Sequence, residues 1–568
     1  MESARLLDHE VSGSMGEGYE VTVGRGADAN ALTLPEEDDD EKVKVPVDDD
    51  KTWFSFRTFW FYTGPGFLMS IAYLDPGNIE SDLRSGSTAQ YKLLWVLLCA
   101  HIVGMLLQRM SARLGVVTGQ HMAEVAYKFY PRVPRLILWL MIEIAIWGSD
   151  MQEVIGTAIA LLLLFRLPLV FGVIITMMDT IIFLLFERQG IRLLELFFCV
   201  LISIMAITFG FEYVTVNPDH LEVIKGIFVP ICPGCGQEQF IQAISVVGAV
   251  IMPHNLYLHS ALVKSRKVGR DSKAKITQAN KYFTLESALA LVISFFINVF
   301  VVSVFAYGLY EKTNNEVRTA CLAAHGIPDT DAFPANNETV NADLYKGGIF
   351  LGCEFGKLAM IVWGVGILAA GQSSTMTGTY TGQFVMEGFL QLSWPRWQRL
   401  LVTRIIAILP TLVVVLWANG VESLTGMNDL LNCVQMIQLP FALIPIITFT
   451  SSEKIMHDFR SSKAFQIFAL GASVVVIGIN IYFIQDTLIS NFGTQWYIIT
   501  ALVIFSILYF SFIIYLAVVC LMACGFIPEI IRIGPLTITA DAEIDAPWKQ
   551  VSGVSNDGFT SSVPFLDR

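Results

Sequence analysis

Apolar runs of bilayer-spanning length recur along most of this chain and constrain its fold more than any other feature. A helix needs roughly 20 apolar residues to cross the hydrocarbon core of a membrane. Hydropathy predicts twelve such runs, over residues 59–79, 93–108, 136–165, 168–186, 193–214, 240–263, 283–310, 348–371, 400–417, 430–450, 464–484 and 496–524. Because lipid cannot satisfy free backbone polar groups, each run is expected to be helical. The sequence therefore predicts an all-α polytopic membrane protein.

Charged residues divide the chain and orient it. Much of the net charge of −13 lies in an acidic, aperiodic segment, so residues 1–52 are expected to form a disordered cytoplasmic tail. Residues 53–450 are expected to form a ten-helix core, 451–524 two additional transmembrane helices, and 525–568 a cytoplasmic C-terminal tail. Lys and Arg gather in the loops on the terminal side, including residues 264–281, which predicts cytoplasmic termini. Asn337 begins an Asn-Glu-Thr glycosylation acceptor on the opposite, outer side.

Two of the predicted helices contain polar residues beside a proline. The first run contains Asp-Pro-Gly-Asn at residues 75–78, and the sixth contains Met-Pro-His-Asn at residues 252–255. Proline removes a backbone donor and clashes with the preceding turn, so a helix is expected to break at each place. Broken helices at matching positions of two halves are typical of transporters with inverted repeats. We infer two five-helix halves, spans one to five and six to ten, with two extra helices appended.

The residues at the two breaks suggest a cation site. Asp75 offers a carboxylate oxygen, Asn78 an amide oxygen, Ala249 a freed carbonyl and Met252 a thioether. Mg²⁺ and Ca²⁺ prefer oxygen ligands alone, whereas a soft sulfur atom biases a site toward transition-metal ions. Core packing is the alternative for Met252, since most methionines in apolar helices serve that purpose.

Ionisable residues in the third and sixth runs suggest a proton pathway. Glu143, Asp150 and Glu153 share one face of the third helix, and carboxylates in a membrane line an interior path rather than face lipid. A structural ion pair with Arg404 is the alternative reading. His254 is a proton-relay candidate because histidine titrates near physiological pH, and His259 is a weaker one. Each histidine has the alternative of a buried structural role.

The remaining motifs are less specific. Cys232 and Cys235 lie in one loop and Cys321 in another, where a turn with or without a disulfide is favoured over a zinc or redox site. The sequence does not determine which cysteines pair. Glu2, Leu6 and Leu7 fit an acidic dileucine pattern that would bind a sorting adaptor.

With Asp-Pro-Gly-Asn and Met-Pro-His-Asn in order, the chain resembles the natural resistance-associated macrophage protein family of proton-coupled divalent metal transporters. Residues 371–389 are similar to a loop signature that follows the eighth span of that family. The resemblance implies a LeuT-like fold and a metal site at Asp75, Asn78, Ala249 and Met252, which Asn432 joins in some states. It also implies a proton route; its residues are Asp150, Glu153, His254, Arg404 and, at its edge, Glu143.

These patterns together predict a secondary transporter that imports Fe²⁺ or Mn²⁺ with protons by alternating access. No enzymatic activity, permanent cofactor or nucleic-acid partner is expected, and no His-Glu-x-x-His zinc motif is present. The plasma membrane, the endosomal–lysosomal membranes or both are the expected location. A sodium-coupled amino-acid carrier of the same fold and a cation channel are the alternatives. A carrier of amino acids would not need a thioether, and Asp75 would repel its substrate's carboxylate.

Overall fold

The computed structural model describes residues 42–46, 54–176, 178, 191–323, 332–391, 396–417, 421–492, 496–528, 530–533, 536–539 and 543–552. The predicted sorting residues Glu2, Leu6 and Leu7 lie outside this part of the chain. In the first half the helices are α1 (Phe56–Tyr62), α2 (Pro65–Ile71), α3 (Pro76–Ala89), α4 (Leu94–Thr118), α5 (Met122–Phe129), α6 (Arg132–Phe165), α8 (Ile191–Val216) and α9 (His220–Phe228).

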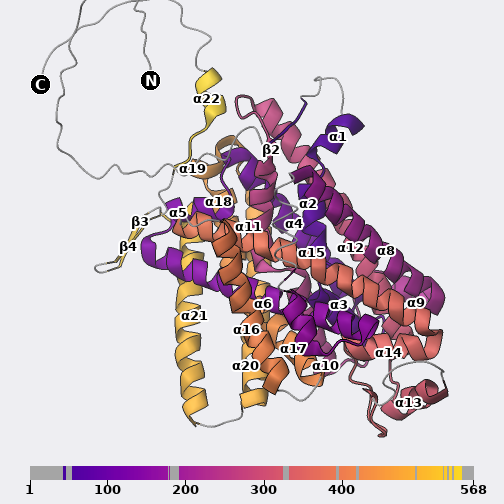
Figure 1. Ribbon diagram of the computed structural model, residues 1–568. Helices are drawn as coiled ribbons and strands as arrows, with labels where there is room; N and C mark the ends of the chain where they lie inside the picture. The colour runs from indigo at the N-terminus through magenta and orange to yellow at the C-terminus, as the bar shows by residue number, and fades with distance from the viewer. Residues whose placement is uncertain are drawn as a thin grey trace, which may run out of the picture. The chain divides into compact units, whose positions relative to one another are not determined.

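The second half repeats the broken-helix arrangement. Its helices are α10 (Gln237–Val250), α11 (Pro253–Leu262), α12 (Lys273–Gly308), α13 (Asn314–Ala323), α14 (Leu344–Phe355), α15 (Lys357–Leu390), α16 (Arg396–Trp417), α17 (Val421–Gln438) and α18 (Pro440–Ser451). There follow α19 (Glu453–Met456), α20 (Lys463–Phe492), α21 (Trp496–Ala523) and α22 (Pro547–Ser552). The long helices α20 and α21 pack against α18 (Figure 1).

Short strands occur only outside the long helices of the described chain. Strand β1 (Val43–Lys44) pairs in parallel with β2 (Arg266–Lys267), and β3 (Ile530–Ile533) pairs antiparallel with β4 (Leu536–Thr539). The first pair joins the segment before α1 to the connection between α11 and α12. Figure 1 shows α1 and β2 at the end of the helix bundle opposite α13 and α14.

Nine helices in the described part of the chain are long and apolar enough to cross a membrane. Three of the twelve predicted runs are missing from that set for separate reasons. The first is divided among α1, α2 and α3, and about half of the fourth lies outside the described residues. The ninth belongs to α16, in which only the shorter apolar segment Arg404–Val413 is found. The prediction of an all-α polytopic membrane protein is confirmed.

Two predicted boundaries are wrong because polar residues are buried inside protein. The first run does not end at residue 79, since α3 continues to Ala89 through Glu80, Ser81 and Asp82, which are all buried. The eighth run was expected over 348–371, whereas α15 spans Lys357–Leu390. The signature at residues 371–389 is therefore helical and not a loop. Hydropathy measures transfer to lipid, and it underestimates helices whose polar side chains face other helices.

The polar stretch of α15 is helical because its hydroxyls and glycines suit a close helix contact. Thr379 Oγ1 donates to the Thr375 carbonyl at 2.7 Å, so this hydroxyl is satisfied within its own helix. Glycines seven residues apart, at 364, 371 and 378, all face α6, where added Cβ atoms would press on or overlap its side chains. Small residues allow helix backbones to approach closely in membranes. The α6–α15 contact is accordingly the most extensive between any two described helices.

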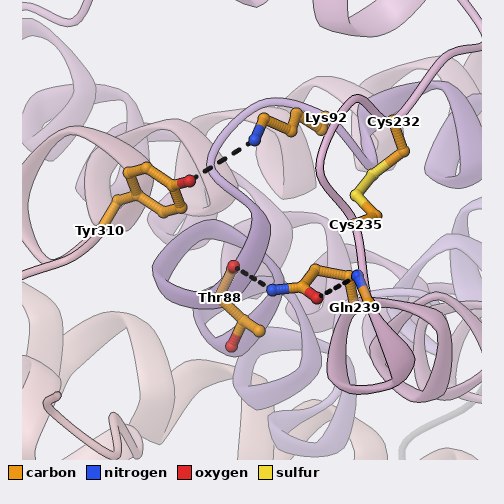
Figure 2. The surroundings of a disulfide bond; sticks show 7 residues. Thr88, Lys92, Cys232, Cys235, Gln239 and Tyr310 are labelled. Carbon is orange, nitrogen blue, oxygen red and sulfur yellow. Dashed lines mark hydrogen bonds between the residues drawn. A yellow bond between two sulfur atoms is a disulfide. The ribbon is translucent and has the colours of Figure 1, made fainter.

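The described chain contains one disulfide within a loop and one between two helices, so Cys321 lies in a helix and not in the predicted loop. Cys232 pairs with Cys235 in the loop before α10, and Cys321 of α13 pairs with Cys353 of α14. Figure 2 shows the first bond beside the end of α3, where Gln239 donates to the Thr88 carbonyl at 3.2 Å. The first turn of α10 is thus attached to α3. Asn337 is exposed between α13 and α14.

Candidate metal and proton site

The first helix break lies between α2 and α3. Helix α2 ends at Ile71, and Asp75 caps α3 by accepting the backbone N–H of Asn78 at 2.8 Å. Pro76 has no N–H, so the carbonyl of Ala72 loses the partner that a continuous helix would supply. The neighbouring carbonyl of Tyr73 accepts from the side chain of Asn298 in α12 at 3.1 Å. The break is therefore supported both by local hydrogen bonds and by a side chain of α12.

The second break lies between α10 and α11. Ile251 ends α10 by donating its N–H to the Val247 carbonyl at 2.9 Å, and Met252 occupies the N-cap of α11. Pro253 cannot donate to the carbonyl of Ala249, four residues earlier, so this oxygen is left for another partner. Ala249 and Met252 are both buried. A freed carbonyl and a thioether thus occur together at the second break.

Asp75 supplies a buried carboxylate that can accept more hydrogen bonds than it receives. Its Oδ1 accepts from the Asn78 side chain at 2.6 Å as well as from the backbone, whereas Oδ2 has no hydrogen-bond partner among the described residues. The residue is 1% exposed. An unpartnered buried carboxylate oxygen is costly unless it holds a proton or faces a cation. Asp75 is therefore suited to exchange a proton for a metal ion.

Asn432 of α17 lies beside the second break. Its Oδ1 accepts from Gln152 Nε2 at 2.7 Å, and its Nδ2 donates to Ser245 Oγ of α10 at 3.5 Å. A Cβ placed on Gly248 would lie 3.3 Å from the backbone carbonyl of Asn432. Since Gly248 precedes Ala249, the structure brings Asn432 against the same turn that frees the Ala249 oxygen.

The carboxylates of the predicted proton pathway are buried on α6. Glu143 accepts from Trp139 Nε1 at 3.0 Å, while neither oxygen of Asp150 has a hydrogen-bond partner in the described part of the chain. Glu153 Oε2 lies 3.8 Å from Arg404. A structural ion pair with Arg404 therefore accounts for the burial of Glu153. It does not account for the burial of Asp150.

Arg404 is itself fixed by α15. One of its terminal nitrogens donates to the Thr375 carbonyl at 2.7 Å and to Thr379 Oγ1 at 3.1 Å. A Cβ on Gly378 would overlap Asp150 Oδ1, so the glycine leaves space for this carboxylate. The signature of α15 thus encloses the acidic face of α6 and places the guanidinium beside it.

The two histidines of α11 are buried. His254 Nδ1 has no partner in the described chain, and His259 Nε2 lies 3.5 Å from Ser287 Oγ of α12. Helix α11 packs against α6. No described hydrogen bond joins either histidine to an α6 carboxylate, so the structure places them near the pathway without connecting them to it.

Sequence reasoning missed a group of buried residues at the α1–α2 junction. Arg266, predicted to lie in a basic loop, is buried and donates to the carbonyls of Phe61 and Thr63 at 3.0 and 2.7 Å. It also pairs with Glu195 of α8 at 2.7 Å. Glu286 of α12 accepts from the N–H groups of Gly64 and Gly66, the latter at 3.0 Å. We call Arg266, Glu195 and Glu286 the α2 clamp; the ionisable Glu286 within an apolar run was the available signal.

Two further buried residues near the first break were not predicted from the sequence. Glu80 of α3 accepts from the side chain of Asn428 of α17, and Gln152 bonds three groups of α17. Among the described residues no group of three or more His, Cys, Asp or Glu side chains is arranged to hold a metal ion. The described residues at the two breaks offer amide, carbonyl and thioether groups beside the carboxylate of Asp75.

Comparisons with known proteins identify one family over most of the chain. A family model described as natural resistance-associated macrophage protein-like matches residues 66–486. The chain is 65% identical to the NRAMP-like transporter smf-1 of Caenorhabditis elegans, over 90% of this chain and 91% of that one. It is 56% identical to the human natural resistance-associated macrophage protein 2, over 85% of each.

A solved structure is similar over nearly its whole length. The Eremococcus coleocola manganese transporter, in complex with an aromatic bis-isothiourea substituted compound, is 27% identical, with a TM-score of 0.71 over 85% of this chain and 98% of that one. The predicted fold class, with its broken first and sixth helices, is confirmed. The chain belongs to the natural resistance-associated macrophage protein family.

Proposed function

We propose that this protein is a secondary transporter that moves Fe²⁺ or Mn²⁺ into the cytosol together with protons. The observation that carries the proposal is the pair of helix breaks. Among the described residues Asp75 Oδ2 has no hydrogen-bond partner, and Pro253 cannot donate to the Ala249 carbonyl as a continuous helix would. Asn78 and the buried Met252 complete the set of ligands, which Asn432 joins in part of the cycle. The similar bacterial chain is described as a manganese transporter, which supports this choice of substrate.

The ligand set favours a transition-metal ion over Ca²⁺. Calcium binds six to eight oxygens, whereas this site offers few oxygens and one sulfur. The thioether of Met252 contributes little to a hard ion and more to Fe²⁺ or Mn²⁺. No permanent cofactor is needed, because the metal ion is the substrate.

Proton coupling follows from the chemistry of Asp75. Metal binding requires an ionised carboxylate, so a proton held by Asp75 must leave as the ion binds. Asp150 and Glu153 of α6 are acceptors for it, and Arg404 stabilises the ionised form of Glu153 across 3.8 Å. We infer that protons pass along this face of α6, with Glu143 at its edge and with His254 and His259 as relays on α11.

Alternating access is supported by the separate attachments of α2 and α3. This seven-residue helix lies between the break at residues 72–75 and Gly64, whose φ of 148° is accessible mainly to glycine. The α2 clamp holds one end of α2, while α3 is held separately by Asn428 and by Gln242, which donates to the Ser81 carbonyl at 2.9 Å. We infer that α2 moves against its neighbours when the clamp opens, while α3 stays in place.

The topology of the chain is part of the same proposal. Both termini lie in the cytoplasm. The exposed Asn337 follows in the sequence after α13, which lies at the opposite end of the bundle from α1 (Figure 1), and it accepts a glycan. The ten-helix core extends to residue 450, α20 and α21 are additional, and the flanking tails are cytoplasmic. An adaptor that recognises Glu2, Leu6 and Leu7 would direct the protein from the plasma membrane to endosomes and lysosomes.

Uptake of radiolabelled Mn²⁺ into proteoliposomes tests the function. Uptake that requires an inward proton gradient, proceeds without sodium and withstands excess Ca²⁺ is expected for the wild type. Asp75→Asn removes the carboxylate but keeps its size, and it is expected to abolish uptake while the protein still folds. Gradient-independent flux far above carrier turnover would indicate a channel, and a sodium requirement would favour the amino-acid carrier.

A further inference from the structure

Gln152 lies beside the acidic face of α6 but points at a different helix. Its side chain is fully buried and makes three hydrogen bonds, all to α17. Nε2 donates to Asn432 Oδ1 at 2.7 Å and to the Asn428 carbonyl at 3.2 Å, and Oε1 accepts from Gln435 Nε2 at 2.8 Å. One amide therefore binds two turns of α17 to α6.

The orientation of these amides is determined by the backbone. The carbonyl of Asn428 can only accept, so the atom of Gln152 that bonds to it must be the nitrogen. The same nitrogen then requires an oxygen on Asn432, and Gln152 Oε1 requires a donor on Gln435. The amide oxygen of Asn432 is consequently directed toward α6, and its NH₂ group is directed toward Ser245 on α10.

Gln152 also touches the first helix break. A Cβ placed on Gly77 would lie 2.8 Å from Cδ, Nε2 and Oε1 of Gln152 alike, so the flat face of the amide lies on this glycine. Gly77 stands in the Asp-Pro-Gly-Asn motif beside Asn78. A single side chain of α6 thus contacts the motif that supplies Asp75 and holds the oxygen of Asn432.

We propose that Gln152 is a positioning residue that engages the Asn432 oxygen while the site holds no metal ion and releases it to the ion during transport. The inference rests on the proposed function and deepens it, because it names the group that competes with the substrate for a ligand. An ion that recruits Asn432 must displace the N–H of Gln152 or turn the amide away from it. The bond therefore weakens metal binding by about three- to tenfold, the range of one net hydrogen bond.

A double-mutant cycle on Mn²⁺ binding, measured by calorimetry on the purified full chain, tests this role. Gln152→Met keeps the length of the side chain but offers no N–H, and it is expected to tighten Mn²⁺ binding three- to tenfold. In an Asn432→Ala background the same change is expected to have no effect. Gln466→Met is the matched control, because this buried amide of α20 bonds to the Ser461 carbonyl at 3.0 Å, and its loss should leave Mn²⁺ binding unchanged.

The possible results separate the inference from the function on which it rests. Unchanged or weaker binding in Gln152→Met, or an equal effect with and without Asn432, would show that Gln152 only packs α17 and would overturn the inference alone. If the wild type neither binds nor transports Mn²⁺, the proposed function fails and the inference fails with it. Should Gln152→Met not fold, Gln152→Leu carries the test, since it is also uncharged and offers no donor to Asn432.

Discussion

Replacing Arg266 by alanine should release α2 from the arrangement in which the α2 clamp holds it, which we call the closed state. The guanidinium is fully buried; it bonds the carbonyls of Phe61 and Thr63 at 3.0 and 2.7 Å and pairs with Glu195 at 2.7 Å. Removing one partner of a buried ion pair costs about 3–5 kcal/mol. If only the closed state contains these bonds, a loss of about 3 kcal/mol shifts the ratio of open to closed forms by about 100-fold, since each 1.4 kcal/mol is a factor of ten.

Cysteine accessibility measures this shift. Leu68 of α2 is 3% exposed, so Leu68→Cys should react slowly with a membrane-impermeant maleimide applied from the cytoplasmic side, in a background without the exposed Cys99 and Cys199. Adding Arg266→Ala should raise the labelling rate up to about 100-fold. Arg266→Lys should restore the slow labelling only in part, because an ammonium group cannot reproduce the planar, forked hydrogen bonding of a guanidinium.

Arg270→Ala is the matched control for this experiment. Arg270 lies in the same connection between α11 and α12, but it donates to the Val116 carbonyl of α4 at 3.2 Å and not to the α1–α2 junction. Its replacement should leave the labelling of Leu68→Cys unchanged. An unchanged rate in Arg266→Ala, with the protein folded, would refute the reasoning that Arg266 holds α2 closed.

Two further predictions concern selectivity and pH. Met252→Leu conserves volume, so it should change unfolding stability by less than about 1.5 kcal/mol. It should nevertheless lower Mn²⁺ uptake at limiting metal at least about tenfold and admit Ca²⁺ as a competitor; unaltered selectivity would make Met252 a packing residue. Burial lowers the pKa of His121, at the start of α5, to about 4, despite Glu124 at 3.5 Å. The His121 side chain is therefore protonated in the unfolded chain below about pH 6.5, but in the folded protein only below about pH 4. Over this range the free energy of unfolding decreases by about 3 kcal/mol in total. Thermal melts should show a shallower decline for His121→Gln, and equal slopes would contradict the assignment.

The amino-acid sequence by itself determined the membrane architecture and the two breaks. Apolar runs of this length can only be helices in lipid, and a proline within such a helix frees a carbonyl whatever the surroundings. The chemistry of Asp75, Asn78, Ala249 and Met252 could therefore be predicted locally. Their role in binding metal stays a prediction that the uptake experiments test.

Only the tertiary structure decided how the polar residues are partnered. Glu80 and the hydroxyl-rich turns of α15 read as loops by hydropathy, because hydropathy cannot distinguish a polar side chain in water from one that faces another helix. Gln152 is separated from Asn432 by 280 residues, and Arg266 from Thr63 by 203. Hydrogen bonds at such separations depend on how the helices pack. For the same reason, the sequence could not show that Cys321 pairs with Cys353. Nor could it show that Arg266, Glu195 and Glu286 meet at the α1–α2 junction.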